Sequence, residues 1–195
     1  DTDRSRGLGD VYKRQLGINL EEIVESRILP SHLRQKDKDD KLGILDVRVL
    51  LNNKEQIDIE IQVTSSEYWA ERTLFYLGKM FVDQLKPGED YQKLEKCIHV
   101  GILNFTLFDD EEYYSRFHFW SDQGRKMYSD KFEIHTLELP KLAKHEYPET
   151  ELLKWLQFIN AESKEEFEMA AEKSKYIKKA YEDLNRILSL IHISE

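Results

Sequence analysis

The chain has a single cysteine, Cys97, and therefore cannot form an internal disulfide bond. Its apolar runs are far shorter than the about 20 residues that a helix needs to cross a bilayer. It has no phosphate-binding glycine loop, no dinucleotide-binding glycine motif and no cysteine–histidine cluster spaced for zinc. These absences predict a cytoplasmic protein in which Cys97 is a buried, reduced thiol.

Positive charge is also scarce, because 29 Lys and Arg residues against 38 Asp and Glu residues give a net charge of −9. A domain that binds nucleic acid is usually basic, so this balance argues against casual nucleic-acid binding. The argument is not decisive, since acidic clusters that hold a cation contribute to the same sum. No Ser-His-Asp or Cys-His arrangement is visible, and facing carboxylates on adjacent strands would lie too close for an inverting glycosidase.

The length of 195 residues, with 40% hydrophobic residues, predicts one globular domain with a sizeable core. Both ends differ from the rest. Residues 5–15 (SRGLGDVYKRQ) and 188–195 (LSLIHISE) can each be encoded by an adapter used in transposon-based sequencing libraries, read from opposite strands. We therefore assign residues 1–15 and 188–195 to the adapter, exclude them from the fold, and expect a natural sequence over 16–187 that is truncated at both ends.

The segment around which the chain is organised runs from Gly43 to Val63 and predicts a β-hairpin. Two segments of alternating apolar and polar residues flank a polar turn at residues 52–54. If the turn is centred on residue 53, positions whose numbers sum to 106 face each other. The facing pairs on the polar side are then Asp46–Glu60, Arg48–Asp58 and Ile44–Gln62.

The facing carboxylates of Asp46 and Glu60 admit two interpretations. Like charges opposite each other destabilise a sheet unless a cation neutralises them, and Mg²⁺ binds a few carboxylate oxygens. A half-exposed sheet face also carries acidic residues without any metal, and Arg48 can neutralise both carboxylates. The residues alone leave both interpretations open.

Apolar periodicity predicts the remaining elements. A helix over Thr64–Leu85 begins with a Thr64–Glu67 capping box, ends before Pro87–Gly88, and packs an apolar stripe on the sheet. His99 is interpreted as a core histidine rather than a ligand. The other predicted elements are strands over 97–105 (central and buried), 114–120 and 132–139, a loop over 31–41, and helices over 149–160 and from a Ser163–Glu166 capping box to Leu184. Residues 23–29 admit a short strand or a helical turn.

A family resemblance adds to these predictions. ILD followed by IEIQ, with Asp46, Glu60 and Gln62, resembles the PD-(D/E)XK nuclease signature. DKLGILDVRV, IDIEIQVTSSEYWAERTLFYLGKMFVDQL, PGEDYQKL and CIHVGILNF, in this order, resemble the PD-(D/E)XK nuclease family transposases, also called recombination-promoting nucleases. The resemblance implies an α/β fold: a restriction-endonuclease-like mixed β-sheet with flanking helices over residues 16–142, followed by a helical extension over 143–187. Of the two alternatives for residues 23–29, the resemblance favours the strand.

The resemblance implies a metal-dependent DNA endonuclease with a role in mobile-element recombination. Asp46 and Glu60 would hold Mg²⁺ or Mn²⁺, and Gln62, which replaces the signature lysine, would position the attacking water. Lys79 is expected to substitute for that lysine, and Arg72 to bind phosphate. Arg116 belongs to an expected DNA-contact surface that consists of Tyr113, Tyr114, Arg116, Arg125 and Lys126.

Two alternatives stay open. The missing lysine, the acidic balance and the expected truncation favour a catalytically inactive nuclease fold that binds DNA or protein. The truncation matters because such nucleases often have an upstream helix with an additional acidic residue. The helical C-terminal extension also permits an oligomerising scaffold, in which the helices join copies of the chain.

Overall fold

A computed structural model describes residues 25–29, 46–52 and 54–192 of the chain. The Ile44–Gln62 pair, the loop over 31–41 and the segment 1–15 of the sequence predictions lie outside these residues. The chain divides into two compact units, with the boundary between residues 145 and 146.

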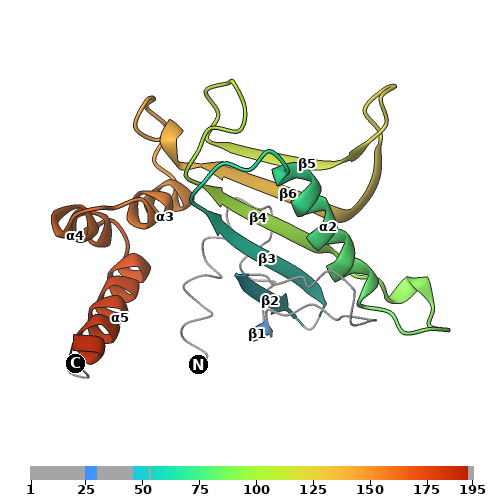
Figure 1. Ribbon diagram of the computed structural model, residues 1–195, viewed down its shortest axis with the longest axis horizontal. Helices are drawn as coiled ribbons and strands as arrows, with labels where there is room; N and C mark the ends of the chain where they lie inside the picture. Colours follow the sequence, from blue (N-terminus) through green and yellow to red (C-terminus); the bar gives the residue numbers. More distant parts are fainter. Residues whose placement is uncertain (1–24, 30–45, 53, 193–195) are drawn as a thin grey trace. The chain divides into compact units, whose positions relative to one another are not determined.

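The larger unit is built on a mixed sheet that has six strands in the described part of the chain, in the order β1-β2-β3-β4-β6-β5 (Figure 1). β3, β4 and β6 run parallel to one another, and the outer pairs are antiparallel. This sheet and its flanking helix confirm the predicted fold class. The strands are β1 (Ser26–Leu29), β2 (Val47–Leu51), β3 (Glu55–Gln62), β4 (Cys97–Leu103), β5 (Tyr114–Trp120) and β6 (Met127–Glu138).

β2 and β3 form the predicted hairpin in the predicted register, with Arg48 opposite Asp58. Asn52 enters the turn with a positive φ of 49°, a conformation that Asn adopts more readily than most residues. Asp46 lies just before β2, and its Oδ2 accepts a hydrogen bond of 3.0 Å from the backbone N–H of Ile61. This bond ties the start of β2 to the end of β3, next to Glu60.

β4 is the central strand, and every residue of it is buried, as its continuous apolar pattern predicts. Its register with β3 pairs Asp58 with His99 and Glu60 with Gly101. These four residues therefore share one face of the sheet, while the intervening isoleucine and valine residues fill the other. Cys97 at the start of β4 is a buried free thiol, and burial raises its pKa to about 12.

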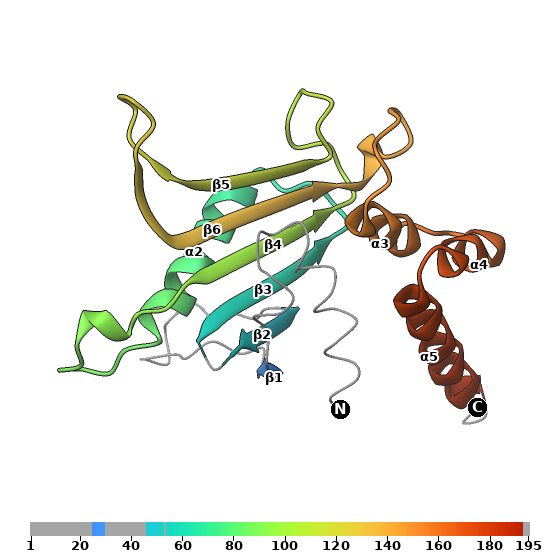
Figure 2. The same ribbon diagram turned by 180° about the vertical axis from the view of Figure 1, so that it is seen from behind.

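The helix α2 (Trp69–Val82) crosses the face that carries His99 and Gly101 (Figure 1), and Figure 2 shows the opposite face of the same sheet. Trp69 fits against Gly101, where an added Cβ would come within 2.5 Å of the indole. Of the six residues of the predicted stripe, five are buried and the sixth, Phe81, is half-buried; the buried ones are Trp69, Thr73, Tyr76, Leu77 and Met80. Tyr76, Leu77, Met80 and Cys97 form a core cluster against Phe81, Phe132 and Ile134.

The predicted boundaries of this helix were wrong at both ends. Residues 63–66 are irregular and residues 67–68 form a turn, so the Thr64–Glu67 capping box is absent and Tyr68 takes the N-cap position without a side-chain hydrogen bond. The chain needs these residues to pass from the end of β3 onto the face of the sheet. The helix ends at Val82, five residues before Pro87, and a short 3₁₀ helix follows at Tyr91–Lys93.

One edge of the sheet is formed by β5, which pairs with β6 in a hairpin. β5 matches the predicted strand, but β6 begins five residues earlier than predicted, at Met127 rather than Phe132. The irregular register between Phe117 and Trp120 interrupts the apolar alternation there, which hides this part of the strand from a pattern argument. A 3₁₀ helix, Leu139–Lys141, follows β6.

The second unit contains α3 (Glu151–Ile159), α4 (Lys164–Glu172) and α5 (Lys175–His192). The Ser163–Glu166 capping box is present as predicted. The prediction of one final helix was wrong, because the helix is interrupted at Lys173 and Ser174. The Ser174 hydroxyl accepts a hydrogen bond from the backbone N–H of Tyr176. The break allows Ile177 to pack with Trp155, Phe158, Ala170 and Ala171. Among the described helices, none is long and apolar enough to cross a membrane.

Candidate metal centre

Three buried side chains meet on the helix-covered face of the sheet: Asp58 and Glu60 of β3 and His99 of β4. Asp58 and Glu60 are two residues apart in one strand and therefore point to the same side, and His99 lies beside Asp58 in the neighbouring strand. One ligand atom from each residue lies within 4.8 Å of the others. Their exposed fractions are 0% for Asp58 and His99 and 3% for Glu60.

The group contains buried polar atoms that lack hydrogen-bond partners. His99 Nδ1 lies 2.7 Å from Asp58 Oδ2. Asp58 Oδ1, both carboxylate oxygens of Glu60 and His99 Nε2 have no hydrogen-bond partner within the described residues. A buried carboxylate without hydrogen bonds is costly, so native structures pair such groups or use them to coordinate metals. The donor set of two carboxylates and one imidazole fits a divalent cation.

The Arg72 guanidinium reaches this group from α2. Its Nη2 is 2.5 Å from Glu60 Oε1, an ion pair without the angles of a hydrogen bond, and its Nη1 donates to Gln62 Oε1 at 3.4 Å. Burial raises the pKa of the Glu60 carboxyl, and the charge of Arg72 opposes this shift. Glu60 is thus a carboxylate whose charge the surrounding protein groups stabilise poorly.

The other predicted catalytic residues lie around the group at different depths. Asp46 is exposed, and its contact with the Ile61 N–H places it beside Glu60. Gln62 is half-buried, and its Nε2 donates to the carbonyl of Thr64 at 2.9 Å. Lys79 lies seven residues after Arg72, about 10 Å along the helix axis, and its Nζ is 5.8 Å from the ring centroid of Phe75. Within the described residues, Arg72 contacts Glu60 and Lys79 does not.

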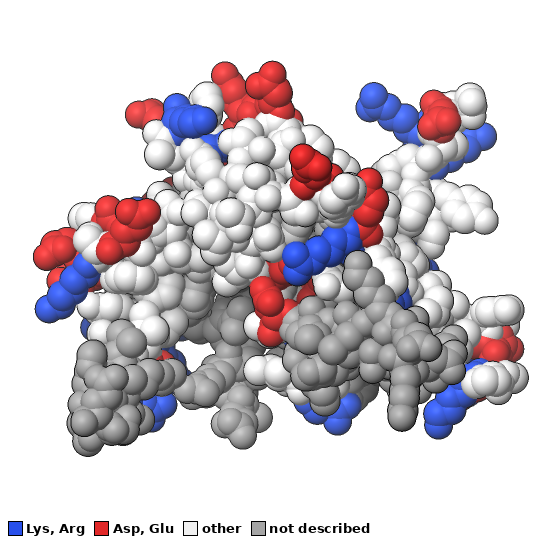
Figure 3. Space-filling model, in the orientation of Figure 1, with Lys and Arg blue, Asp and Glu red and all other residues white. Residues whose placement is uncertain are grey.

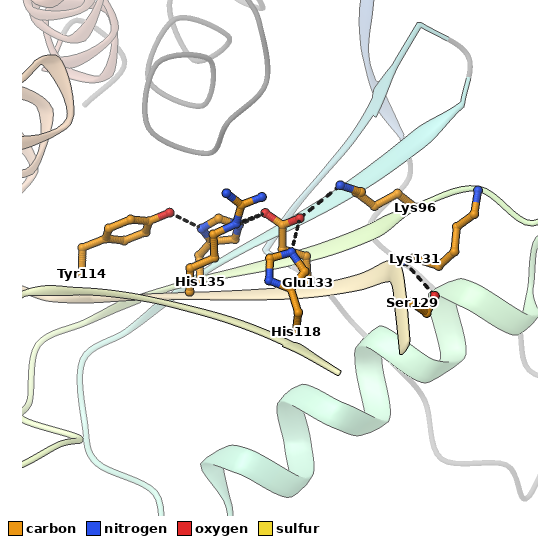
Figure 4. Close-up of polar contacts among 8 residues, drawn as sticks. Lys96, Tyr114, His118, Ser129, Lys131, Glu133 and His135 are labelled. Carbon is orange, nitrogen blue, oxygen red and sulfur yellow. Dashed lines mark hydrogen bonds and ion pairs between the residues drawn. The ribbon is translucent and has the colours of Figure 1, made fainter. Parts of the chain in front are cut away.

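Arg116 does not join the acidic group, because it lies on the opposite face of the sheet. Its Nε is 2.7 Å from Glu133 Oε1. Figure 4 shows Lys96, His118 and His135 pointing at the same Glu133 carboxylate, with Tyr114 bonded to the far side of His135. Burial disfavours the Glu133 charge, but hydrogen bonds from His135 and Arg116 outweigh it and hold the pKa well below its usual range.

The predicted DNA-contact surface is divided by the fold. Tyr113 is buried, and Tyr114 and Arg116 take part in the Glu133 cluster. Arg125 and Lys126 lie instead in the exposed turn of the β5–β6 hairpin, where Lys and Arg side chains flank an acidic one (Figure 3, upper right). The large exposed side chains next to this turn are Phe119, Trp120, Met127 and Tyr128.

Sequence reasoning missed two members of the acidic group, Asp58 and His99. Asp58 was assigned to the polar face of the hairpin but treated only as a partner of Arg48. His99 was interpreted as a core histidine, and it is indeed buried, but it contacts a carboxylate. The signal in the sequence is a histidine in the middle of an otherwise apolar strand, away from any helix cap or turn.

A mixed sheet with a flanking helix, which carries a buried carboxylate–histidine group on the helix-covered face, is consistent with the PD-(D/E)XK nuclease fold. The model of the PD-(D/E)XK nuclease family transposases matches residues 12–189, and the chain belongs to this family. A search of curated proteins and a search of solved structures gave no significant match. Family membership implies phosphodiester hydrolysis as the class of activity and DNA as the partner.

Proposed function

We propose that this protein is a metal-dependent endonuclease that hydrolyses phosphodiester bonds of DNA. The observation that supports the proposal most directly is the set of buried lone-pair atoms on Asp58, Glu60 and His99 that accept no hydrogen bond from any described residue. A metal site explains why a folded protein keeps them, and the family supplies the reaction class. The role in mobile-element recombination is carried over from the family alone.

The residues divide into ligands and phosphate-contacting groups. Glu60, Asp58 and His99 would hold the ion, with Asp46 as a further carboxylate at the exposed rim. A bound Mg²⁺ or Mn²⁺ supplies a lowered pKa for an attacking water and stabilises charge on the phosphate. Gln62 lies two residues after Glu60, and its amide nitrogen donates to the Thr64 carbonyl. Its oxygen accepts the 3.4 Å hydrogen bond from Arg72 and has a second lone pair with which it would orient water.

Three cations were assigned to the catalytic or substrate-binding roles, and the structure supports them unequally. Arg72 is the one in contact with both Glu60 and Gln62, so it is the best placed to counter phosphate charge. Lys79 lies about 10 Å from Arg72 along the axis of α2 and would act on a more distant phosphate of the same DNA strand. Arg116 faces the other side of the sheet and would contact DNA only as part of a separate surface.

The experiment that tests the proposal combines calorimetric titration with Mn²⁺ or Mg²⁺ and a plasmid-nicking assay. Parent chain, Asp46→Ala, Glu60→Ala and His99→Ala are compared, with Asp109→Ala, an exposed acid in a turn, as a charge-matched control. Metal binding and nicking that are lost in the three site variants and kept in the control support the nuclease.

Two other outcomes would favour the alternatives. Metal binding without nicking would favour the inactive binding module, in which the family site is kept without its chemistry. Absence of metal binding by the parent chain would remove the basis of the proposal. A mass in solution that corresponds to several copies, together with no metal binding, would favour the oligomerising scaffold.

A further inference from the structure

Arg72 occupies an unusual place for a substrate-binding residue, because its guanidinium already lies against a metal ligand. It begins the second turn of α2, just after Trp69, which packs on Gly101. Its Nη2 contacts Glu60 Oε1 at 2.5 Å, and its Cζ lies 5.5 Å from the ring centroid of Tyr76. The helix and the aromatic ring therefore fix the guanidinium at the acidic group.

We propose that Arg72 is a built-in counter-ion that competes with the metal ion for Glu60 and, once displaced, binds the substrate phosphate. The inference rests on the proposed metal-dependent function and adds a regulation to the same site. Metal binding and phosphate binding are coupled, because the same guanidinium pairs with Glu60 before the metal ion binds and with the phosphate afterwards.

The geometry of the ion pair supports an exchangeable partner rather than a permanent one. Arginine that neutralises a buried carboxylate permanently tends to do so with two parallel hydrogen bonds. Here the Nη2 contact lacks hydrogen-bond angles, both Glu60 oxygens are without hydrogen bonds in the described part of the chain, and Arg72 Nε is buried and unpartnered as well. The pair neutralises charge without completing the bonding of either group.

A metal ion and the guanidinium cannot share Glu60 without cost. Both would approach the same small carboxylate, and two cations a few ångströms apart repel each other. Arg72 has somewhere to go, because its side chain is 38% exposed, whereas Glu60 is fixed in a central strand. A released guanidinium at the rim of the site matches a phosphate group, which it can bind with two parallel hydrogen bonds.

The test is calorimetric titration of the full chain with Mn²⁺ at about 0.15 M salt, where charges more than about 8 Å apart are screened. Arg72→Met is expected to bind the ion about fivefold more tightly than the parent chain, because a partly exposed competitor has been removed. Circular dichroism reports whether Arg72→Met is folded. Arg72→Gln is a second neutral variant in case Arg72→Met folds poorly. Lys86→Met removes the same charge from an exposed position after α2 that has no role in the site, and it is expected to leave the metal affinity unchanged.

The coupling is tested with a short DNA duplex and Ca²⁺, which binds the same hard oxygen ligands. In the parent chain the duplex should tighten Ca²⁺ binding, and the ion should tighten duplex binding by the same factor. In the Arg72 variants this factor should fall toward one. Equal or weaker Mn²⁺ binding by both neutral variants overturns the counter-ion role while leaving the proposed nuclease site intact. If the parent chain binds no metal at all, the proposed function itself fails.

Discussion

His99 Nδ1 lies 2.7 Å from Asp58 Oδ2, and both side chains are fully buried on neighbouring parallel strands. An imidazole nitrogen that faces a carboxylate carries the proton, so the hydrogen-bond network assigns the proton to Nδ1 and leaves the lone pair on Nε2. Nε2 has no hydrogen-bond partner among the described residues. A carboxylate that orients an imidazole in this way is a common partner of a metal-binding histidine.

Replacement of His99 is therefore expected to weaken metal binding. His99→Leu should lower the Mn²⁺ affinity by about tenfold or more, since it removes one ligand and the group that orients Asp58. Calorimetric titration measures the change. His118→Leu, a histidine on the opposite face that contacts Glu133, is the control. An equal loss of affinity in both variants would contradict the assignment of His99 to the metal centre.

Glu60→Gln should stabilise the metal-free protein at neutral pH. Burial raises the pKa of Glu60 in the folded state above the usual 4.5, so folding favours the protonated form. The stabilisation contributed by that form is complete below about pH 4.5 and is lost as the pH rises through the folded-state value. Thermal unfolding in a chelator should thus show a higher Tm for the variant at pH 7 and a difference that shrinks near pH 4. A lower Tm at pH 7 would argue that Arg72 satisfies Glu60 fully.

Glu133→Gln, the same substitution at another buried glutamate, should have the opposite effect. Although burial disfavours its charge, hydrogen bonds from His135 and Arg116 hold the Glu133 pKa below the unfolded value. Its stabilisation is present above about pH 4.5 and is lost as the pH falls through the folded-state value. The variant should lose about 3 kcal/mol at pH 7, because four basic or imidazole side chains lose their common acceptor. Urea unfolding at pH 7 and pH 3 measures this, and a constant difference at both values would contradict it.

The turn of the β5–β6 hairpin is expected to contact DNA. Trp120 and Tyr128 beside it are 51% and 89% exposed, and aromatic side chains next to basic ones can stack on bases. Arg125→Ala with Lys126→Ala should weaken binding of an oligonucleotide and reduce the slope of log affinity against log salt by about two. Lys144→Ala with Lys178→Ala removes two exposed lysines elsewhere and is the control. Equal losses in both double variants would show a non-specific charge effect.

The hairpin register illustrates how far the sequence reaches. Alternation on both sides of a polar turn admits one register that places Ile57 and Ile59 on a buried face, and this register predicts the Arg48–Asp58 pair, which is present. The central strand β4 was equally clear, because its apolar residues are continuous. Boundaries were less accurate: the start of α2 and the start of β6 depend on how the chain turns onto the sheet and on strand irregularities, neither of which leaves a periodic signal.

The fold class, the family and the position of Glu60 on a polar strand face follow from the amino-acid sequence, because alternation and ordered motifs are local properties of the chain. The groups that meet Glu60 follow from the packing of the strands and of α2. The parallel pairing of β3 with β4 brings His99 beside Asp58, although 41 residues separate them. The crossing of α2 brings Arg72, and not Lys79, to the carboxylate. These contacts depend on strand order and helix placement, and no spacing in the sequence records either.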